Sequence, residues 1–280
     1  MKRFDIITCL PSYFHSVTHY GVTRVAFANQ WANLVIHDLR QYGQGNHKAI
    51  DDRPFGGFDG MVLAADPIAT ALENIDGINE PDTVLIYFSP QGERLNQRLL
   101  IKFYQTFNRY ILLCGRYAGV DQRVINYFGM KEISIGDYVL SGGELPAMVF
   151  IDGIVRLIPG TLGNQQSVSN DSFSGSEQHL LEPPLFTRPR KWRGQNVPDI
   201  LISGNHKEIN IWKRFVSLII TKLKRPDLFD QILLSHEEKN QLIDFITCLT
   251  EGDKKALGIP TNLLDDLKFD LTGRKHHESQ

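Results

Sequence analysis

Residues 135–147 have the sequence IGDYVLSGGELPA, and this stretch decides which fold the chain is expected to adopt. Its apolar first half belongs to a short run that predicts a strand over residues 133–140, interrupted by a glycine. Its second half places Ser141 and Glu144 at the spacing of a capping box, which predicts a helix over residues 144–157. The stretch therefore predicts a strand, a glycine-rich turn and a helix in direct succession.

Other short apolar runs extend this pattern toward the N-terminus. Residues 4–8, 83–88 and 110–114 are short and rich in isoleucine, leucine, valine and tyrosine, so we expect three buried strands there. A helix is predicted over residues 93–108, after a proline and a glycine that favour a turn. Because strands alternate with helices, and the connections are long enough for crossovers, the sequence predicts an α/β fold with a parallel sheet.

The composition changes after residue 160, and this change predicts the domain organisation. Residues 1–160 form the expected α/β domain. Residues 161–190 are polar and rich in glycine and serine, which is typical of a flexible interdomain linker. Residues 191–255 carry helical periodicity and capping signals at Asn205 and Ser235, which predict a helical domain. Residues 256–280 are interpreted as a C-terminal extension without an assigned role.

Charge is distributed unevenly along the second half of the chain. Residues 188–225 contain ten lysines or arginines and two acids, whereas residues 226–280 contain six basic residues and eleven acids. The basic segment includes Trp192 and Trp212. Two interpretations are open: contact with nucleic-acid phosphates, with a tryptophan stacked on a base, or an ordinary solvated helix face with both tryptophans in the core.

The overall composition is ordinary for a globular protein, with 42% hydrophobic residues, 22% charged residues and a net charge of −2. The three cysteines are scattered and no C-x-x-C motif occurs, so we expect neither a disulfide framework nor a zinc site. No apolar run approaches the ~20 residues of a membrane span and no charged-then-apolar leader is present, which favours a cytoplasmic protein without membrane contact.

Glycine-marked turns follow three of the predicted strands, at residues 89–92, 114–119 and 141–146. In an open parallel sheet, ligands bind outside the carboxyl ends of the strands, and glycine lets a backbone approach a ligand closely. Together the turns predict a site for a nucleotide-like ligand. No G-x-G-x-x-G follows the first strand and no P-loop motif occurs, which argues against a dinucleotide-dependent dehydrogenase and against a P-loop NTPase.

Several of these motifs resemble those of the TrmD family, whose members are tRNA guanine-N1 methyltransferases that act at position 37. The resemblance covers about residues 1–250, and its most specific part is the stretch at 135–147. The other matches are DDRPFGG at 51–57, CGRY at 114–117 and shorter segments at 171–173, 187–189 and 201–206. The resemblance implies a SPOUT-type α/β fold, with a deep trefoil knot in its parallel sheet and a smaller helical C-terminal domain. It also implies a homodimer whose subunits share each active site.

The resemblance further implies that S-adenosyl-L-methionine is the methyl donor. The residues that match the family's cofactor-binding positions are Tyr87, Phe88, Ser89, Pro90, Gly115, Tyr117, Ile135, Gly136, Asp137, Tyr138, Val139, Leu140, Gly142, Gly143 and Pro146. Family members generally need Mg²⁺ for activity, but the sequence contains no cluster of metal ligands and predicts no metal site on the protein. Glu144 is explained by the capping box and is assigned no chemistry.

Methylation of guanine at N1 needs two groups, because N1 carries a proton and negative charge grows on O6 as that proton leaves. By resemblance, Asp171 is the base that removes the proton, supplied across the dimer, and Arg156 is the partner of O6. The alternatives are an Asx turn or helix cap for Asp171 and an i,i+4 ion pair with Asp152 for Arg156.

Contact with tRNA is expected from the basic segment and from the segment at 52–57, which by resemblance lies near the active site. The residues concerned are Asp52, Arg53, Arg188, Arg190, Lys191 and His206. The alternatives are a solvated turn before Pro54 and, for His206, no more than a helix N-terminus. One departure from the family is Ala118, where the family has glutamate. It leaves open a tRNA-binding homologue with weakened or lost catalysis.

Overall fold

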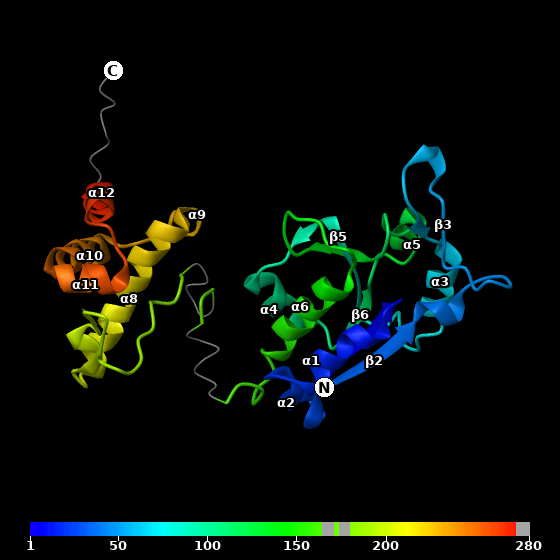
Figure 1. The fold of residues 1–280 in the computed structure, drawn as a ribbon, viewed down its shortest axis with the longest axis horizontal. Coiled ribbons are helices and arrows are strands. Elements are labelled where there is room, and N and C mark those ends of the chain that lie inside the picture. Colours follow the sequence, from blue (N-terminus) through cyan, green and yellow to red (C-terminus); the bar gives the residue numbers. More distant parts are fainter. Residues whose placement is uncertain (164–170, 174–179, 273–280) are drawn as a thin grey trace, which may run out of the picture. The chain divides into compact units, whose positions relative to one another are not determined.

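The computed structural model describes residues 1–163, 171–173 and 180–272. The chain divides into two compact units, Met1–Val168 and Ser169–Gln280 (Figure 1). The first unit contains a parallel sheet with helices on both faces, and the described part of the second is mainly helical. The predicted α/β class with a parallel sheet is therefore confirmed.

The sheet of the first unit has five strands, all parallel, in the order β2-β1-β6-β5-β7. Their bounds are β1 Lys2–Thr8, β2 Ala32–Asp38, β5 Thr83–Arg94, β6 Arg109–Leu113 and β7 Lys131–Ser134. A short antiparallel pair lies outside this sheet and consists of β3 Asp51–Asp52 and β4 Val62–Leu63. The three N-terminal strand predictions are confirmed as β1, β5 and β6. The edge strand β2 was missed because most of it is only half-buried and its sequence lacks a continuous apolar run.

Helices cover both faces of the sheet, because side chains alternate between the faces along each strand. Phe4 and Ile6 of β1 pack in a core with four helices: α1 His15–His19, α2 Thr23–Ala28, α4 Gln97–Thr106 and α6 Glu144–Val155. Ile7 packs on the opposite face with α3 Ala65–Glu73 and α5 Gln122–Tyr127. Short 3-10 helices occur at Pro11–Phe14, Leu39–Tyr42 and Phe55–Gly57.

Strand β5 runs further than its apolar core predicted. Phe88 and Glu93 both pair with Ile133 of β7, so the four residues between them lie outside the regular ladder. The predicted turn at 89–92 is therefore an irregularity within the strand. As a result the helix expected from residue 93 begins only at Gln97, where the Asn96 side chain accepts a hydrogen bond from the Leu99 N–H at 2.9 Å.

The strand predicted over residues 133–140 is wrong beyond Ser134, where β7 ends. Gly136 has a φ of 143°, which is outside the strand region, and Val139 is 94% exposed. The apolar side chains of this segment therefore do not pack in the sheet. The predicted capping box is also wrong, because the residue that caps α6 is Gly143 and no side chain caps this helix.

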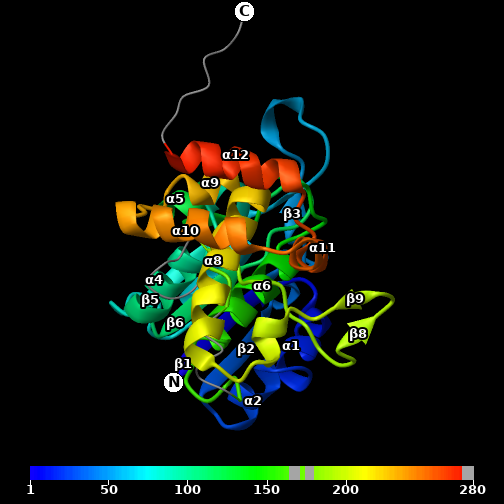
Figure 2. The same ribbon diagram turned by 90° about the vertical axis from the view of Figure 1, so that its left-hand side faces the viewer.

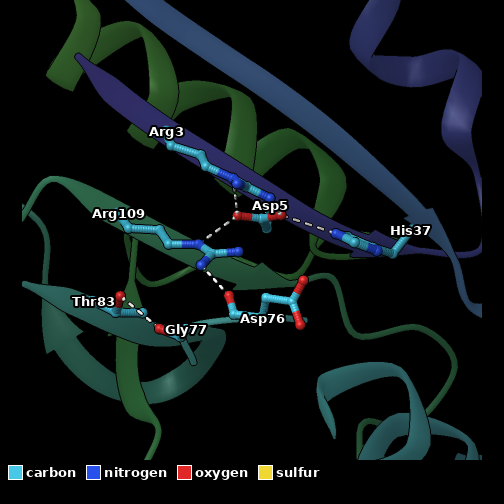
Figure 3. Close-up of polar contacts among 7 residues, drawn as sticks. All are labelled: Arg3, Asp5, His37, Asp76, Gly77, Thr83 and Arg109. Carbon is cyan, nitrogen blue, oxygen red and sulfur yellow. Dashed lines mark hydrogen bonds and ion pairs between the residues drawn. The ribbon is translucent and has the colours of Figure 1, made fainter. Parts of the chain in front are cut away.

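A buried ionic cluster is centred on Asp5 (Figure 3). Asp5 precedes Ile7 by two residues on β1, so its side chain points to the same face of the sheet. The carboxylate of Asp5 on β1 is fully buried and accepts hydrogen bonds from Arg3 Nε and Arg109 Nε, both at 2.9 Å, while His37 Nε2 lies 3.0 Å away. Burial alone would raise the pKa of this carboxyl, but the hydrogen bonds from His37, Arg109 and Arg3 hold it well below its usual range. Arg109 also donates to the carbonyl of Asp76. The cluster ties β1, β2 and β6 together.

The second unit is built around the long helix α8 His206–Lys224, with α10 and α12 lying across it (Figure 2). Its other elements are β8 Lys191–Trp192, β9 Gln195–Asn196, a 3-10 helix at Asp199–Ile202, α9 Pro226–Phe229, α10 His236–Cys248, α11 Glu251–Leu257 and α12 Thr261–Thr272. The capping signals are confirmed at Asn205, which caps α8, and at Ser235, which forms a capping box with Glu238. Leu264 and Leu267 of α12 are buried in the same core as Trp212.

Candidate active site

A pocket of about 230 Å³ lies at the carboxyl ends of β5, β6 and β7. Its walls are the irregular part of β5, the loop after β6 and the loop between β7 and α6. The lining residues are Tyr87, Phe88, Ser89, Pro90, Gly115, Arg116, Tyr117, Ala118, Gly119, Ile133, Ser134, Ile135, Gly136, Tyr138, Val139, Leu140, Ser141, Gly142, Gly143 and Pro146. This is the edge of an open parallel sheet at which ligands are expected to bind.

Backbone hydrogen bonds hold the loops of this pocket together. The N–H of Gly143 donates to the carbonyl of Gly115 at 2.8 Å, and Arg116 forms an antiparallel bridge with Gly142. On the other side, the N–H of Ala118 donates to the carbonyl of Met61 at 2.9 Å. The loop after β6 is therefore fixed between the loop before α6 and the segment that follows β3.

Glycine is required at two positions of the pocket because the backbone there approaches other atoms closely. A Cβ at Gly143 would lie 2.7 Å from the Cα of Cys114 and 2.9 Å from the backbone nitrogen of Gly115. A Cβ at Gly115 would lie 2.8 Å from the ring of Tyr87. Neither position has room for a side chain, because Gly143 packs against the backbone of the loop after β6 and Gly115 packs against the ring of Tyr87 on β5.

Fourteen of the fifteen predicted cofactor-binding residues line this pocket. The exception is Asp137, whose exposed carboxylate lies 4.0 Å from Arg94 Nη1. The structure adds six lining residues that the sequence analysis did not select: Arg116, Ala118, Gly119, Ile133, Ser134 and Ser141. All six lie within or beside the motifs already quoted, so a contiguous selection along those motifs would have included them.

Glu144 is a buried acid beside the pocket and not the helix-capping residue that its spacing predicted. Its carboxylate accepts a hydrogen bond from the Thr8 hydroxyl at 2.9 Å and lies 3.7 Å from Arg116 Nη1. Thr8 ends β1, so Glu144 joins the first strand to the loop after β6. Sequence reasoning missed this role because the partners are far away along the chain.

Burial changes the pKa of two other polar side chains near the pocket. Burial raises the pKa of the Tyr87 phenol and raises that of the Cys114 thiol well above its usual value. Cys114 is fully buried within the apolar core on the α6 face of the sheet. It therefore behaves as a small core residue and is unsuited to act as a nucleophile.

The two predicted catalytic residues lie in different units. Arg156 follows directly after α6, and both it and Asp152, one helical turn earlier, are exposed. Asp171 belongs to the short described segment 171–173 of the second unit. That segment is held through its neighbours: the Ser172 hydroxyl accepts from the N–H of Glu182 at 2.9 Å, and the Phe173 N–H donates to the carbonyl of Leu180 at 3.0 Å.

The predicted tRNA contacts also occur in both units. Asp52 lies in β3 and accepts from the N–H of Arg53 at 2.7 Å, and both residues line a groove of about 930 Å³ with α3 and α5. Arg188, Arg190 and Lys191 are exposed, and Arg190 Nη2 lies 2.8 Å from Asp199. His206 is the exposed first residue of α8.

No metal site is found in the described residues 1–163, 171–173 and 180–272, where no three or more His, Cys, Asp or Glu side chains are grouped to hold an ion. In the same part of the chain, no helix has both the length and the apolar character that crossing a bilayer requires.

Comparison with known proteins identifies the family. A family model described as tRNA (Guanine-1)-methyltransferase TrmD matches residues 1–231. A protein of Ehrlichia canis (strain Jake) is 45% identical over 228 residues, which are 81% of this chain and 95% of that protein. A protein of Shewanella sp. (strain ANA-3) is 41% identical over 251 residues, 90% of this chain and 98% of that protein. A protein of Buchnera aphidicola subsp. Schizaphis graminum is 43% identical over 236 residues, 84% of this chain and 88% of that protein. All three are named tRNA (guanine-N(1)-)-methyltransferase, and by this similarity the present chain belongs to the TrmD family.

Proposed function

We propose that this protein transfers a methyl group from S-adenosyl-L-methionine to N1 of guanosine 37 in tRNA, in the cytoplasm. Family membership supports the reaction, since the relatives carry that enzymatic name. The observation that carries the proposal is the pocket at the carboxyl ends of β5, β6 and β7, which the most specific motif of the sequence lines.

The pocket has the character that S-adenosylmethionine requires. Gly115 and Gly143 leave the loop backbones bare, and the apolar side chains of Ile133, Leu140 and Pro146 line the same cavity. Bound there, the cofactor supplies a methyl group activated on a positively charged sulfur. The residues of this chain then have to bind the cofactor, exclude water and hold guanine N1 in line with that methyl group.

Asp171 and Arg156 take the two roles that the guanine demands in this proposal. The carboxylate of Asp171 removes the proton from N1, and the guanidinium of Arg156 donates hydrogen bonds to O6 as negative charge grows there. N1 lies on the Watson–Crick edge, so the target base must be unpaired when it enters the site. Arg53, Arg188, Arg190 and Lys191 would supply positive charge to the phosphates of the tRNA, with Asp52 and His206 near the bound RNA.

The proposal includes the homodimer and the trefoil knot of the family. Leu145 and Val149 of α6 are 44% and 50% exposed, and Arg156 continues the same helix face at i+7 from Val149. Exposed apolar residues on one helix face suit contact with another protein surface. In such a dimer, each active site would combine Asp171 of one subunit with Arg156 of the other. The knot would be formed by the two loops that the Gly143–Gly115 hydrogen bond joins.

Methyl transfer from labelled S-adenosylmethionine tests the function directly. The substrate is a tRNA transcript with guanosine at positions 36 and 37, compared with one changed at position 37, in buffer containing Mg²⁺ because the family generally needs it. We expect label only in the intact transcript and at N1. Incorporation at another atom, or none although both ligands bind, would contradict the proposal.

The role of Asp171 is tested with Asp171→Asn. We expect turnover to fall by about 10²–10⁴-fold, the contribution of a general base, while affinity for S-adenosylmethionine stays unchanged. Asp265→Asn is the matched control, since Asp265 is an exposed acid on α12. Retained turnover in Asp171→Asn would remove Asp171 from the role of base.

A further inference from the structure

The β8–β9 hairpin of the second unit is a short two-stranded element with an exposed tryptophan near its turn. Lys191 pairs with Asn196 and Trp192 with Gln195, so the turn consists of two residues. These are Arg193 and Gly194, with φ values of 47° and 81°. Positive φ at both central positions is the signature of a type I′ turn, whose twist matches that of a hairpin. Figure 2 shows the hairpin reaching outward from α8, with its turn at the far end.

The two tryptophans of the basic segment have different surroundings. Trp212 is 5% exposed and lies in the core of the helical unit, as an ordinary structural residue does. Trp192 is 58% exposed, and every residue from 188 to 196 is exposed as well. Because both faces of the hairpin are open, the Trp192 indole is not a core residue. An exposed tryptophan on such an element needs another explanation.

The hairpin concentrates positive charge around this indole. Residues 188–193 have the sequence RPRKWR, which contains four arginines or lysines and no acid. The guanidinium of Arg193 lies 4.9 Å from the centre of the Trp192 ring, in a cation–π contact. Alternation along the strand places Arg190 on the same face as Trp192 and Lys191 on the other. Charge is therefore available on both faces.

The ion pair between Arg190 and Asp199 leaves the guanidinium of Arg190 able to bind a phosphate. Arg190 Nη2 and the Asp199 carboxylate are 2.8 Å apart, but the two side chains are 67% and 88% exposed. Exposed pairs of this kind contribute little, about 0.2–1 kcal/mol. A phosphate can therefore compete with Asp199 for the guanidinium at small cost.

We propose that the tip of this hairpin binds single-stranded nucleotides of the tRNA. Trp192 stacks on an unpaired base, and Arg190, Lys191 and Arg193 contact the adjoining phosphates. Proteins bind single-stranded nucleic acids with exposed aromatic rings flanked by cations, because every base has a face that stacks and every phosphodiester linkage carries a negative charge. This assignment rests on the proposed function, because it makes tRNA the ligand.

The test measures affinity for tRNA apart from methyl transfer. Trp192→Ala, Trp192→Phe, Arg193→Ala and the wild type are titrated with the tRNA transcript at several salt concentrations. We expect Trp192→Ala to weaken binding about tenfold with little change in salt dependence, and Trp192→Phe to keep most of the affinity. Arg193→Ala should weaken binding and lower the slope of log K against log salt by about one. Leu233→Ala, at a 97% exposed apolar position of the same unit, is the matched control and should bind as the wild type does.

Fluorescence gives a second readout that a purely structural tryptophan would not affect. The chain has three tryptophans, so emission quenched by tRNA in the wild type and not in Trp192→Phe reports stacking on Trp192 itself. Melting curves of each variant check that the helical unit stays folded. Wild-type affinity in Trp192→Ala, or equal quenching in Trp192→Phe, would overturn the assignment.

The outcomes also separate this assignment from the proposed function. An affinity for tRNA that is independent of Trp192, together with intact methyl transfer, overturns the hairpin assignment alone. Binding of tRNA that depends on Trp192, without methyl transfer by the wild type, overturns the proposed function alone. Vesicles containing anionic phosphatidylglycerol are titrated in parallel. Binding to vesicles but not to tRNA would assign the hairpin to a membrane surface and overturn the RNA contact.

Discussion

Two parts of the sheet in the first unit have very different surroundings. At the carboxyl edge, three loops line the pocket, glycines bring their backbones together, and several apolar side chains are exposed. Around Asp5 the same sheet buries a carboxylate whose oxygens are surrounded by two arginines and a histidine. The first region leaves space for a ligand, and the second leaves almost none. The comparison leads us to expect that the proposed ligand binding and the stability of the unit depend on different parts of it and respond separately to mutation.

The largest expected effect is on ligand binding. Gly143→Ala places a Cβ 2.7 Å from the Cα of Cys114, so the loops must move apart. We expect at least about a hundredfold loss of affinity for S-adenosylmethionine, a free energy of about 2.7 kcal/mol. Calorimetric titration measures this loss. Gly252→Ala on α11 is the control, since its Cβ would meet only Thr250 Oγ1 at 3.5 Å. Unchanged affinity in Gly143→Ala would show that the close approach of the backbones at Gly143 is not needed for cofactor binding.

The next effect is on stability. Asp5→Ala leaves Arg109, which is 9% exposed, without the carboxylate that neutralises it. Breaking a buried pair in this way costs about 3–5 kcal/mol of unfolding free energy. Denaturant titration of the folded protein gives this number. Arg123→Ala, which removes an exposed partner of Asp121 at 2.7 Å, is expected to cost less than about 1 kcal/mol. A cost equal in both variants would contradict the special role of the buried cluster.

Acid provides a smaller perturbation of the same cluster. The pKa of Asp5 is held below its usual range in the folded chain, so its contribution to stability is complete above the unfolded pKa of about 3.9. That contribution is lost as the pH falls from the unfolded value toward the lower folded one. We expect the melting temperature of the wild type to fall more steeply than that of Asp5→Asn between about pH 5 and pH 3. Parallel slopes would show that other carboxyls dominate acid unfolding.

The smallest expected effect concerns Ala118, a pocket residue at a position where the resemblance noted in the sequence implies a glutamate. We expect Ala118→Glu to change the rate of methyl transfer by less than about threefold, or roughly 0.7 kcal/mol. A gain of about tenfold or more would match one charged hydrogen bond and would mean that catalysis in this chain is weakened. Initial rates at saturating cofactor and tRNA measure the difference.

The sequence predicted those features that depend on neighbouring residues. The buried runs of β1, β5 and β6 and the caps at Asn205 and Ser235 depend on local patterns. The pocket residues were selected through the resemblance of contiguous motifs to those of the family. The failures share a physical cause. Val139 and Leu140 are apolar, as in a strand, but they belong to a pocket wall, and periodicity does not distinguish these environments. The partners of Asp5 and Glu144 come from distant strands and loops, and no local pattern reveals such contacts.

Because of the irregularity in β5, residues of the pocket wall can change without changing the strand pairing of the sheet. Phe88 and Glu93 occupy the same rung opposite Ile133, so the residues between them do not count in the ladder of hydrogen bonds. A change in the chemistry of Ser89 or Pro90 therefore leaves the register of β5 and β7 as it is. Selection can alter which ligand this wall accepts while the core that supports it stays constant, and a protein engineer has the same freedom.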